Sequence, residues 1–214
     1  MDAKRRIEQT LVAALANAQS SVCPPRLAAA LRYAVFPGGA RVRPRLTLAV
    51  AAACGERDSA LADAAGAAIE LLHCASLVHD DLPCFDDAPT RRGKPSVHRA
   101  FGERIAVLTG DALIVLAFEV LANAASSAPQ RLAPLVATVA AAVGAPAGLA
   151  AGQAWECEPR VPLAEYQRAK TGALFAAATA AGAQATGADP TQWRILGERL
   201  VLQPTRFKLN GLRP

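Results

Sequence analysis

Four aspartates lie within an eight-residue segment that follows an apolar stretch, and such a cluster could hold metal ions. They are Asp80, Asp81, Asp86 and Asp87. Carboxylates this close repel one another unless cations are present, and Mg²⁺ binds oxygen ligands while leaving coordination positions for phosphate oxygens. Pro83 ends the preceding helix, so the chain can turn back and bring Asp86 near Asp80. We therefore predict a magnesium site here, with a solvated acidic turn as the alternative.

Further candidates come from polar residues inside apolar helical stretches. His73 lies seven residues before Asp80, which is two helical turns, so the two residues share a helix face. A lone histidine in a helix is commonly a core residue, but the shared face favours a position in the cavity of the aspartates. Lys170 and Thr171 interrupt another apolar helix, with a solvated lysine as the alternative. Gly110-Asp111 is interpreted as an N-terminal helix cap rather than a ligand.

Two short basic segments suit the binding of small anions. The first is Gly38-Gly39-Ala40-Arg41-Val42-Arg43, whose glycines allow close backbone approach, and the second is Arg91-Arg92-Gly93-Lys94. Arginine makes forked hydrogen bonds to phosphate oxygens, so magnesium and arginine together predict a diphosphate ligand. The net charge of +5 does not predict a nucleic-acid partner. The acidic cluster would repel phosphate backbones, and aromatic residues for base stacking are scarce.

The elements that must position these residues are predicted to be α-helices. Alanine-rich apolar stretches favour closely packed helices, and 214 residues suit one domain. Proline and glycine breaks divide the chain into eight predicted helices: 4–18, 25–35, 43–54, 58–79, 103–124, 130–143, 162–185 and 190–202. The segments 36–39 and 83–95 are predicted loops, and no sheet is expected.

The cysteines and the apolar stretches predict a cytoplasmic protein without a membrane span. No CxxC pair or zinc-site spacing occurs, which favours free thiols in a reducing compartment. The five cysteines are Cys23, Cys54, Cys74, Cys84 and Cys157. The amphipathic start predicts no signal peptide. The apolar stretch 136–151 contains glycine and proline and is shorter than the ~20 residues that a bilayer span needs.

These motifs, in this order, resemble the trans-isoprenyl diphosphate synthases, specifically the bacterial geranylgeranyl and farnesyl diphosphate synthases, over about residues 1–200. Asp80-Asp81, four further residues and then Asp86 are similar to the family's first aspartate-rich motif. The other segments that match in family order are Gly38-Gly39 through Pro44, Arg91-Arg92-Gly93, Gly110-Asp111 and Lys170-Thr171. The resemblance implies an antiparallel helical bundle around a central cavity, incomplete at its C-terminus, and a homodimer.

The resemblance also implies which residues serve the allylic substrate. Asp80, Asp81 and Asp86 would bind Mg²⁺, and Arg91 would contact the allylic diphosphate. Lys170 would steady the allylic leaving group as a catalytic residue, and Thr171 would be a further substrate contact. The implied reaction condenses isopentenyl diphosphate with dimethylallyl, geranyl or farnesyl diphosphate. The allylic carbon–oxygen bond ionises, the isopentenyl double bond attacks the resulting cation, and a proton is lost. Stabilisation of the departing diphosphate supplies most of the catalysis in this scheme.

A second set of residues is implied for isopentenyl diphosphate. Arg43, His73 and Arg92 would contact its diphosphate group. Ala40 departs from the family pattern, which usually has a lysine at this position, and Arg41 is expected to compensate as a further substrate contact.

Product length is predicted from the helix before the first aspartate. In the family, a bulky aromatic residue five positions before that aspartate stops chain growth early. Here the fifth and fourth positions are Ala75 and Ser76, which leave space for a product of twenty carbons. The alternative is that Ala75 simply fits a tight helix crossing.

The tail departs from the family more strongly. Residues 201–214 contain no acidic residue, where the family has a Phe-Gln pair and a second aspartate-rich motif. We therefore expect a helical domain over 1–200 that lacks its C-terminal helices, carboxylates on only one wall, and weak or absent turnover, as in a truncated or frameshifted product. The main alternative function is a non-catalytic partner subunit of a full-length synthase. A terpene cyclase is disfavoured, because it does not need the isopentenyl diphosphate loop.

Overall fold

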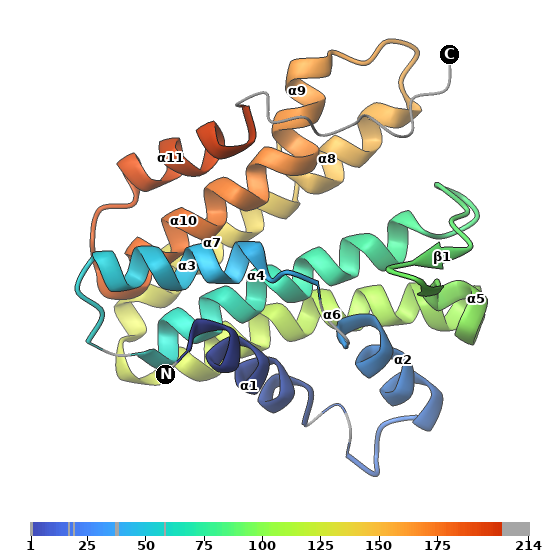
Figure 1. Cartoon of the computed structure of the whole chain (residues 1–214), viewed down its shortest axis with the longest axis horizontal. Helices are drawn as coiled ribbons and strands as arrows, with labels where there is room; N and C mark the ends of the chain where they lie inside the picture. Colours follow the sequence, from blue (N-terminus) through green and yellow to red (C-terminus); the bar gives the residue numbers. More distant parts are fainter. Residues whose placement is uncertain (1, 17, 19, 37–38, 58, 203–214) are drawn as a thin grey trace.

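A computed structural model describes residues 2–16, 18, 20–36, 39–57 and 59–202 (Figure 1). Gly38 of the first basic segment and residues 203–214 of the tail, for which predictions were made, lie outside the described residues. Within the described residues the chain is helical apart from one hairpin of two-residue strands, which confirms the all-α prediction.

The helices begin and end close to the proline and glycine residues that were used to predict their bounds. They are α1 (Ala3–Ala16), α2 (Pro25–Val35), α3 (Val42–Ala53), α4 (Ser59–Asp80), α5 (Val97–Phe101), α6 (Glu103–Ala124), α7 (Leu132–Val143), α8 (Leu149–Ala154), α9 (Leu163–Gln167), α10 (Ala173–Thr186) and α11 (Thr191–Leu202). Single 3₁₀ turns form at Ala125–Ser127, Pro129–Arg131 and Trp155–Cys157. The predicted bounds of α2 and α6 agree with the structure, and those of the other long helices differ by one or two residues.

Some elements were not predicted. The expected helix 162–185 is divided by a π-helical segment, Arg168–Gly172, which separates α9 from α10. Helices α5 and α8 are too short to show a clear hydrophobic period. The expected loop 83–95 carries a hairpin, in which β1 (Thr90–Arg91) pairs with β2 (Lys94–Pro95) across Arg92-Gly93. Both turn residues have positive φ, 53° and 77°, as a tight type I′ hairpin turn requires.

Helix α4 is the centre of the core. It packs against α6, α3, α10 and α1, and α4 and α6 run side by side (Figure 1). Alanine and leucine fill most of its buried positions, and the small alanines let neighbouring helices approach closely. This packing holds the C-terminal end of α4, which carries the aspartates, at the end of the bundle near the hairpin.

Two helices, α4 and α6, are long and apolar enough to cross a membrane by length and composition alone. In α4, 78% of the most apolar window is buried inside the fold, as in the core helix of a soluble protein. In α6 the buried share is only 39%, so this helix has an apolar face that the described chain does not cover. The absence of a membrane span remains a prediction.

Gly110 does not cap a helix, because α6 begins seven residues earlier, at Glu103. Its lack of a side chain instead allows α4 to approach α6. A Cβ atom at this position would lie 2.0 Å from Nε2 of His79, the residue before Asp80. The interpretation of Gly110-Asp111 as a cap is therefore wrong, and the glycine serves helix packing.

Candidate active site

The acidic segment turns back on α4 as predicted from Pro83. The backbone N–H of Asp86 donates to the carbonyl oxygen of Asp80 at 3.0 Å, and that of Phe85 donates to Leu82 at 2.9 Å. Asp87 adopts a left-handed conformation with φ 44°, which lets the chain leave the turn toward the hairpin. Asp80 and Asp86 consequently lie on the same side of the turn.

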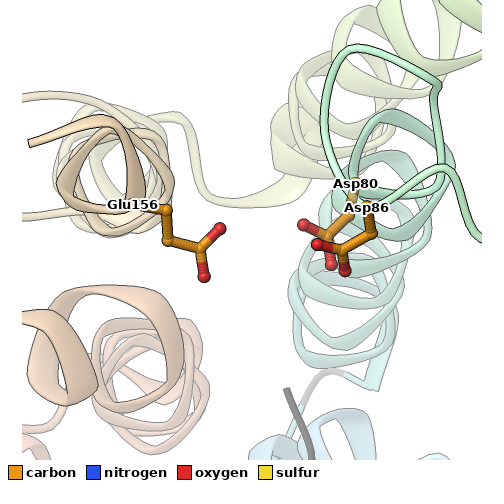
Figure 2. Close-up of side chains that lie close together, drawn as sticks. All are labelled: Asp80, Asp86 and Glu156. Atoms are coloured by element: carbon orange, nitrogen blue, oxygen red, sulfur yellow. The ribbon is translucent and has the colours of Figure 1, made fainter. Parts of the chain in front are cut away.

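A third carboxylate joins them from the opposite wall. One oxygen each of Asp80, Asp86 and Glu156 lies within 4.8 Å of the others (Figure 2). Glu156 belongs to the 3₁₀ turn after α8, and Figure 2 shows its carboxylate pointing toward Asp80 and Asp86 from the other side. The expectation of carboxylates on only one wall is therefore wrong. Glu156 was not predicted, since a single glutamate in a short turn forms no recognisable spacing.

The three carboxylates fit a hard divalent cation such as Mg²⁺. All donors are oxygens, and Oδ1 of Asp80 is buried without a hydrogen-bond partner. Burial raises the pKa of Asp80, and the charge of Asp86 raises it further, while the charge of Lys170 opposes both. A bound cation would favour the ionised carboxylate at this position. Asp80 and Asp86 thus remain predicted metal ligands, and Glu156 is added to them.

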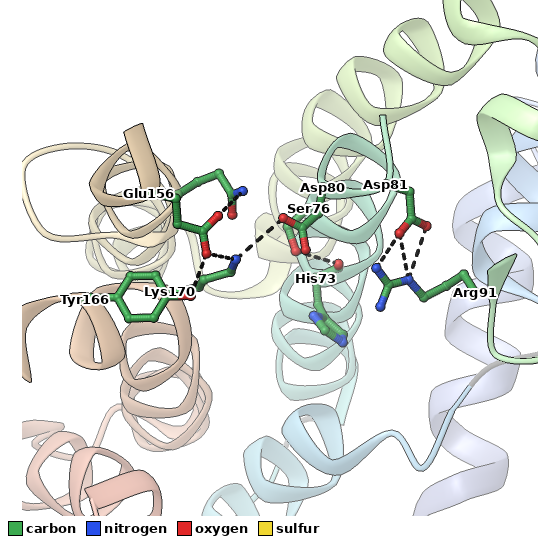
Figure 3. A network of polar contacts seen from close by, with 9 residues as sticks. His73, Ser76, Asp80, Asp81, Arg91, Glu156, Tyr166 and Lys170 are labelled. Carbon is green, nitrogen blue, oxygen red and sulfur yellow. Dashed lines mark hydrogen bonds and ion pairs between the residues drawn. The ribbon is translucent and has the colours of Figure 1, made fainter. Parts of the chain in front are cut away.

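Lys170 lies between Asp80 of α4 and Glu156 of the 3₁₀ turn. Its Nζ is 3.6 Å from Oδ1 of Asp80 and 2.5 Å from Oε1 of Glu156, which also accepts a hydrogen bond from the Tyr166 hydroxyl at 2.5 Å (Figure 3). Burial opposes the charge of Lys170, but Glu156 and Asp80 outweigh it and raise the pKa of the lysine. The Lys170 ammonium group is therefore held beside the carboxylates, and its role at the leaving group remains a prediction.

The π-helical segment that carries Lys170 packs tightly against α8. A Cβ atom on Gly152 of α8 would lie 2.4 Å from the backbone nitrogen of Lys170, so only glycine fits this position. The wider π-helical turn displaces Lys170 from a regular helical register, a feature often found at functional sites. Thr171 is half-buried in the same segment, and its predicted contact with substrate remains a prediction.

Asp81 differs from its neighbour Asp80. Its side chain is 2% exposed, and Nε of Arg91 donates to both of its oxygens, at 3.0 and 3.2 Å. Figure 3 shows this pair on the side of α4 away from Lys170. The prediction that Asp81 binds metal is therefore wrong, because successive helical residues point in directions about 100° apart. Arg91 remains a predicted contact of the allylic diphosphate, held in place by Asp81.

A group of basic residues lies around His73, two turns before Asp80 on the same face of α4. Arg92 packs its guanidinium on Gly39, where an added Cβ would lie 3.1 Å from the Arg92 Cζ. Arg43 lies 4.7 Å above the ring of Phe175, and its Nε is buried without a partner. Burial lowers the pKa of Arg43, although the charge of Glu70 opposes this effect. These positions agree with a site for an anion.

His73 is held in its neutral form. Burial lowers its pKa to about 3, and the charges of Arg43, Arg92 and Arg91 act in the same direction. A neutral imidazole among arginines can donate one hydrogen bond without adding charge.

Arg41 is not part of this basic group. Its side chain is fully buried and forms ion pairs with Glu8 and Glu70, at 2.9 and 2.8 Å. The prediction that Arg41 contacts substrate is therefore wrong, because its donors are already used inside the protein.

The residues predicted to set product length lie on α4. Ala75 is 1% exposed within the hydrophobic core, and the Ser76 hydroxyl donates to the His73 carbonyl at 2.8 Å. Their role in chain length remains a prediction.

The fold and the site define a helical protein in which a group of carboxylates with a lysine lies at the end of α4, next to a basic site for an anion. Comparison with known proteins shows the class of protein. A sequence profile of the polyprenyl synthetase family matches residues 24–202, so the chain belongs to that family of prenyltransferases. It is 58% identical to a geranylgeranyl diphosphate synthase of Cereibacter sphaeroides over 92% of this chain and 68% of the relative. Identity to the synthase of Rhodobacter capsulatus is 53%, over 94% and 69% of the two chains.

Solved structures agree with this assignment. An FPP/GFPP synthase from Zymomonas mobilis superimposes with a TM-score of 0.82 at 34% identity, covering 92% of this chain and 77% of the other. A geranyltransferase from Legionella pneumophila gives 0.83 at 32% identity, covering 93% and 73%. The isoprenoid synthase fold predicted from the motifs is confirmed.

Substitutions at the aspartates test the metal site. We expect Asp80→Ala and Asp86→Ala each to weaken Mg²⁺-dependent binding of inorganic diphosphate about 100-fold, because the remaining carboxylates lose a shared cation. Asp87→Ala is the matched control, since Asp87 pairs with Arg99 at 3.0 Å and lies outside the carboxylate group. Titration calorimetry measures the affinities. Small, equal effects at all three positions would instead identify a solvated acidic turn.

The depressed pKa of His73 predicts a pH dependence of stability. The unfolded chain binds a proton near pH 6.5 and the folded chain only near pH 3, so the free energy of unfolding falls as pH decreases between these values. At about pH 5 the loss is about 2 kcal/mol, and His73→Gln should remove it. Urea unfolding at about pH 7.5 and about pH 5 measures the difference. Identical pH dependence in both proteins would contradict the burial of a neutral His73.

Proposed function

We propose that this chain condenses isopentenyl diphosphate with an allylic diphosphate and makes geranylgeranyl diphosphate. The observation that carries the proposal is the pairing of two anion sites on one face of α4. We call the group of Asp80, Asp86, Glu156 and Lys170, at the C-terminal end of α4, the upper site. His73 marks the lower site, about 10 Å toward the N-terminus of α4 at ~1.5 Å per residue. Two diphosphates bound at these sites would direct their hydrocarbon ends toward the same cavity.

The upper site suits the allylic substrate. Asp80, Asp86 and Glu156 would hold magnesium, which would neutralise the diphosphate leaving group. Lys170 would donate to an oxygen of that group, and Arg91 would approach it from the hairpin, oriented by Asp81. The allylic carbon–oxygen bond then breaks with its electron pair on the diphosphate, where fixed positive charge stabilises the product of ionisation.

The lower site suits isopentenyl diphosphate. Arg43 and Arg92 offer donors that no carboxylate occupies among the described contacts, and His73 adds a neutral donor. The isopentenyl double bond would attack the allylic cation, and the new tertiary cation would lose a proton. Ala40 is exposed beside this site and supplies no charge.

The names of the relatives support catalysis over a role as a non-catalytic partner subunit. The Cereibacter and Rhodobacter relatives are geranylgeranyl diphosphate synthases at 58% and 53% identity. We expect the chain, supplied with Mg²⁺, isopentenyl diphosphate and geranyl diphosphate, to release a twenty-carbon diphosphate, identified by chromatography after dephosphorylation. The rate of release tests the weak or absent turnover predicted from the sequence. Activity that appears only when another synthase is added would favour the partner-subunit alternative.

Product length depends on Ala75 in this proposal. We expect Ala75→Phe to stop elongation at fifteen carbons, because a close-packed wall resists another five-carbon unit by roughly 1–3 kcal/mol or more. Ala62→Phe, at a core position more than three turns earlier on α4, controls for general destabilisation. Both products are measured with dimethylallyl diphosphate as the starter. Release of the same product by the wild-type and Ala75→Phe proteins would show that Ala75 does not limit the cavity.

We also infer a cytoplasmic homodimer associated through α6. Val107, Leu108 and Val115 of this helix are 42%, 51% and 66% exposed, which is unusual for large apolar side chains of one helix. A symmetric contact would cover this face in both copies. The five unpaired cysteines suit a reducing compartment.

Charge on α6 tests the dimer. We expect Val115→Glu to convert the dimer to monomer, because two carboxylates would be buried at the symmetric contact. Val12→Glu, on an apolar residue of α1 that is 51% exposed, is the control and should leave the dimer intact. Sedimentation velocity measures the mass. An unchanged dimer in Val115→Glu would place the contact elsewhere.

A further inference from the structure

Arg41 connects four helices from inside the protein. Its Nε donates to Glu8 of α1 at 2.9 Å, Nη1 to Glu70 of α4 at 2.8 Å, and Nη2 to the carbonyl of Val35, the last residue of α2, at 2.9 Å. Arg41 itself is the residue before α3. A fully buried guanidinium with partners on all sides has one accessible orientation.

Stability alone does not explain this arrangement. Buried ion pairs contribute little net stability relative to apolar residues of similar volume, because both charges lose their hydration. Arg41 also has a left-handed backbone, with φ 50° and ψ 39°. For a residue other than glycine this conformation is unfavourable, because Cβ approaches the following carbonyl oxygen. Such strain persists where surrounding contacts hold the backbone, and it is common near functional sites.

The segment that Arg41 holds contains two contacts of the lower anion site. Gly39, two residues earlier, supports the guanidinium of Arg92. Arg43, two residues later, lies over Phe175 with a free buried Nε. Glu70, the partner of Arg41, lies one helical turn before His73 on α4. The orientation of Arg41 therefore sets the relative positions of Gly39 and Arg43.

We propose that Arg41 is a positioning residue for the isopentenyl diphosphate site, and that Glu8 makes helix α1 part of the substrate-binding machinery. The proposal rests on the proposed function, because it assumes that the lower site binds this diphosphate. Arg41 touches no substrate and acts through Gly39 and Arg43. The upper site is built from the end of α4 and the turn after it, the 3₁₀ turn after α8 and the π-helical segment, and none of the described hydrogen bonds of Arg41 reaches these residues.

The test compares the affinities of the two substrates in folded variants. We expect Arg41→Lys and Glu8→Gln each to raise the Kd of isopentenyl diphosphate, measured without the other substrate, about tenfold. The reason is that small displacements of a binding group have large effects. The Kd of farnesyl diphosphate with Mg²⁺ should stay within about twofold. Calorimetry gives the affinities, and circular dichroism gives the melting temperature. If Arg41→Lys fails to fold, Glu8→Gln still tests the proposal, because Glu8 is only partly buried and its substitution should preserve the fold.

Arg6 supplies the matched control. It fixes the same helix α1 through Asp63 at 2.9 Å and Glu56 at 2.8 Å, away from the basic group. Arg6→Lys should lower the melting temperature without changing either Kd. The proposal is overturned if Arg6→Lys weakens the binding of isopentenyl diphosphate as much as Glu8→Gln does. It is also overturned if the Arg41 and Glu8 variants weaken the binding of both substrates equally, or the binding of neither substrate. Failure of the wild-type chain to bind isopentenyl diphosphate at all would instead overturn the proposed function.

Discussion

Mutual repulsion among carboxylates at the half-buried end of α4 is the constraint around which the site is organised. Asp80, Asp86 and Glu156 lie within 4.8 Å of one another, and burial raises the pKa of Asp80. Positive charge nearby stabilises such a group in its ionised form. Lys170 supplies one cation from the opposite wall. The remaining demand for positive charge fits the divalent ion that we propose for this site, and through it a bound diphosphate.

Close helix packing makes this arrangement rigid. Glycine at 110 lets His79 of α4 lie against α6, and glycine at 152 lets α8 lie against the backbone of Lys170. Both contacts are adjacent to charged residues of the site. A methyl group at either position would separate the elements that bring Asp80 and Glu156 together. The alanine-rich core thus serves geometry as well as burial, because small residues allow the walls of the site to approach.

Neighbouring residues of the same type have separate tasks in this protein. Asp80 joins the carboxylate group, whereas Asp81 is buried against Arg91 on another side of α4. Arg43 keeps a free donor near the anion site, whereas the donors of Arg41 are used by carboxylates and a carbonyl inside the fold. In both pairs the buried and fully paired residue supports the structure, and the other is the one that we propose to act on the ligand.

The sequence by itself determined the features that depend on local interactions. Proline and glycine delimited α2 and set the start of α6, and Pro83 forced the turn that brings Asp86 back to Asp80. The shared face of His73 and Asp80 followed from helical periodicity. Only the tertiary structure decided the partners of Glu156, Asp81 and Arg41, because these contacts join segments between 10 and 76 residues apart. Helical periodicity sets the direction of a side chain, but the packing of helices decides which charge it meets.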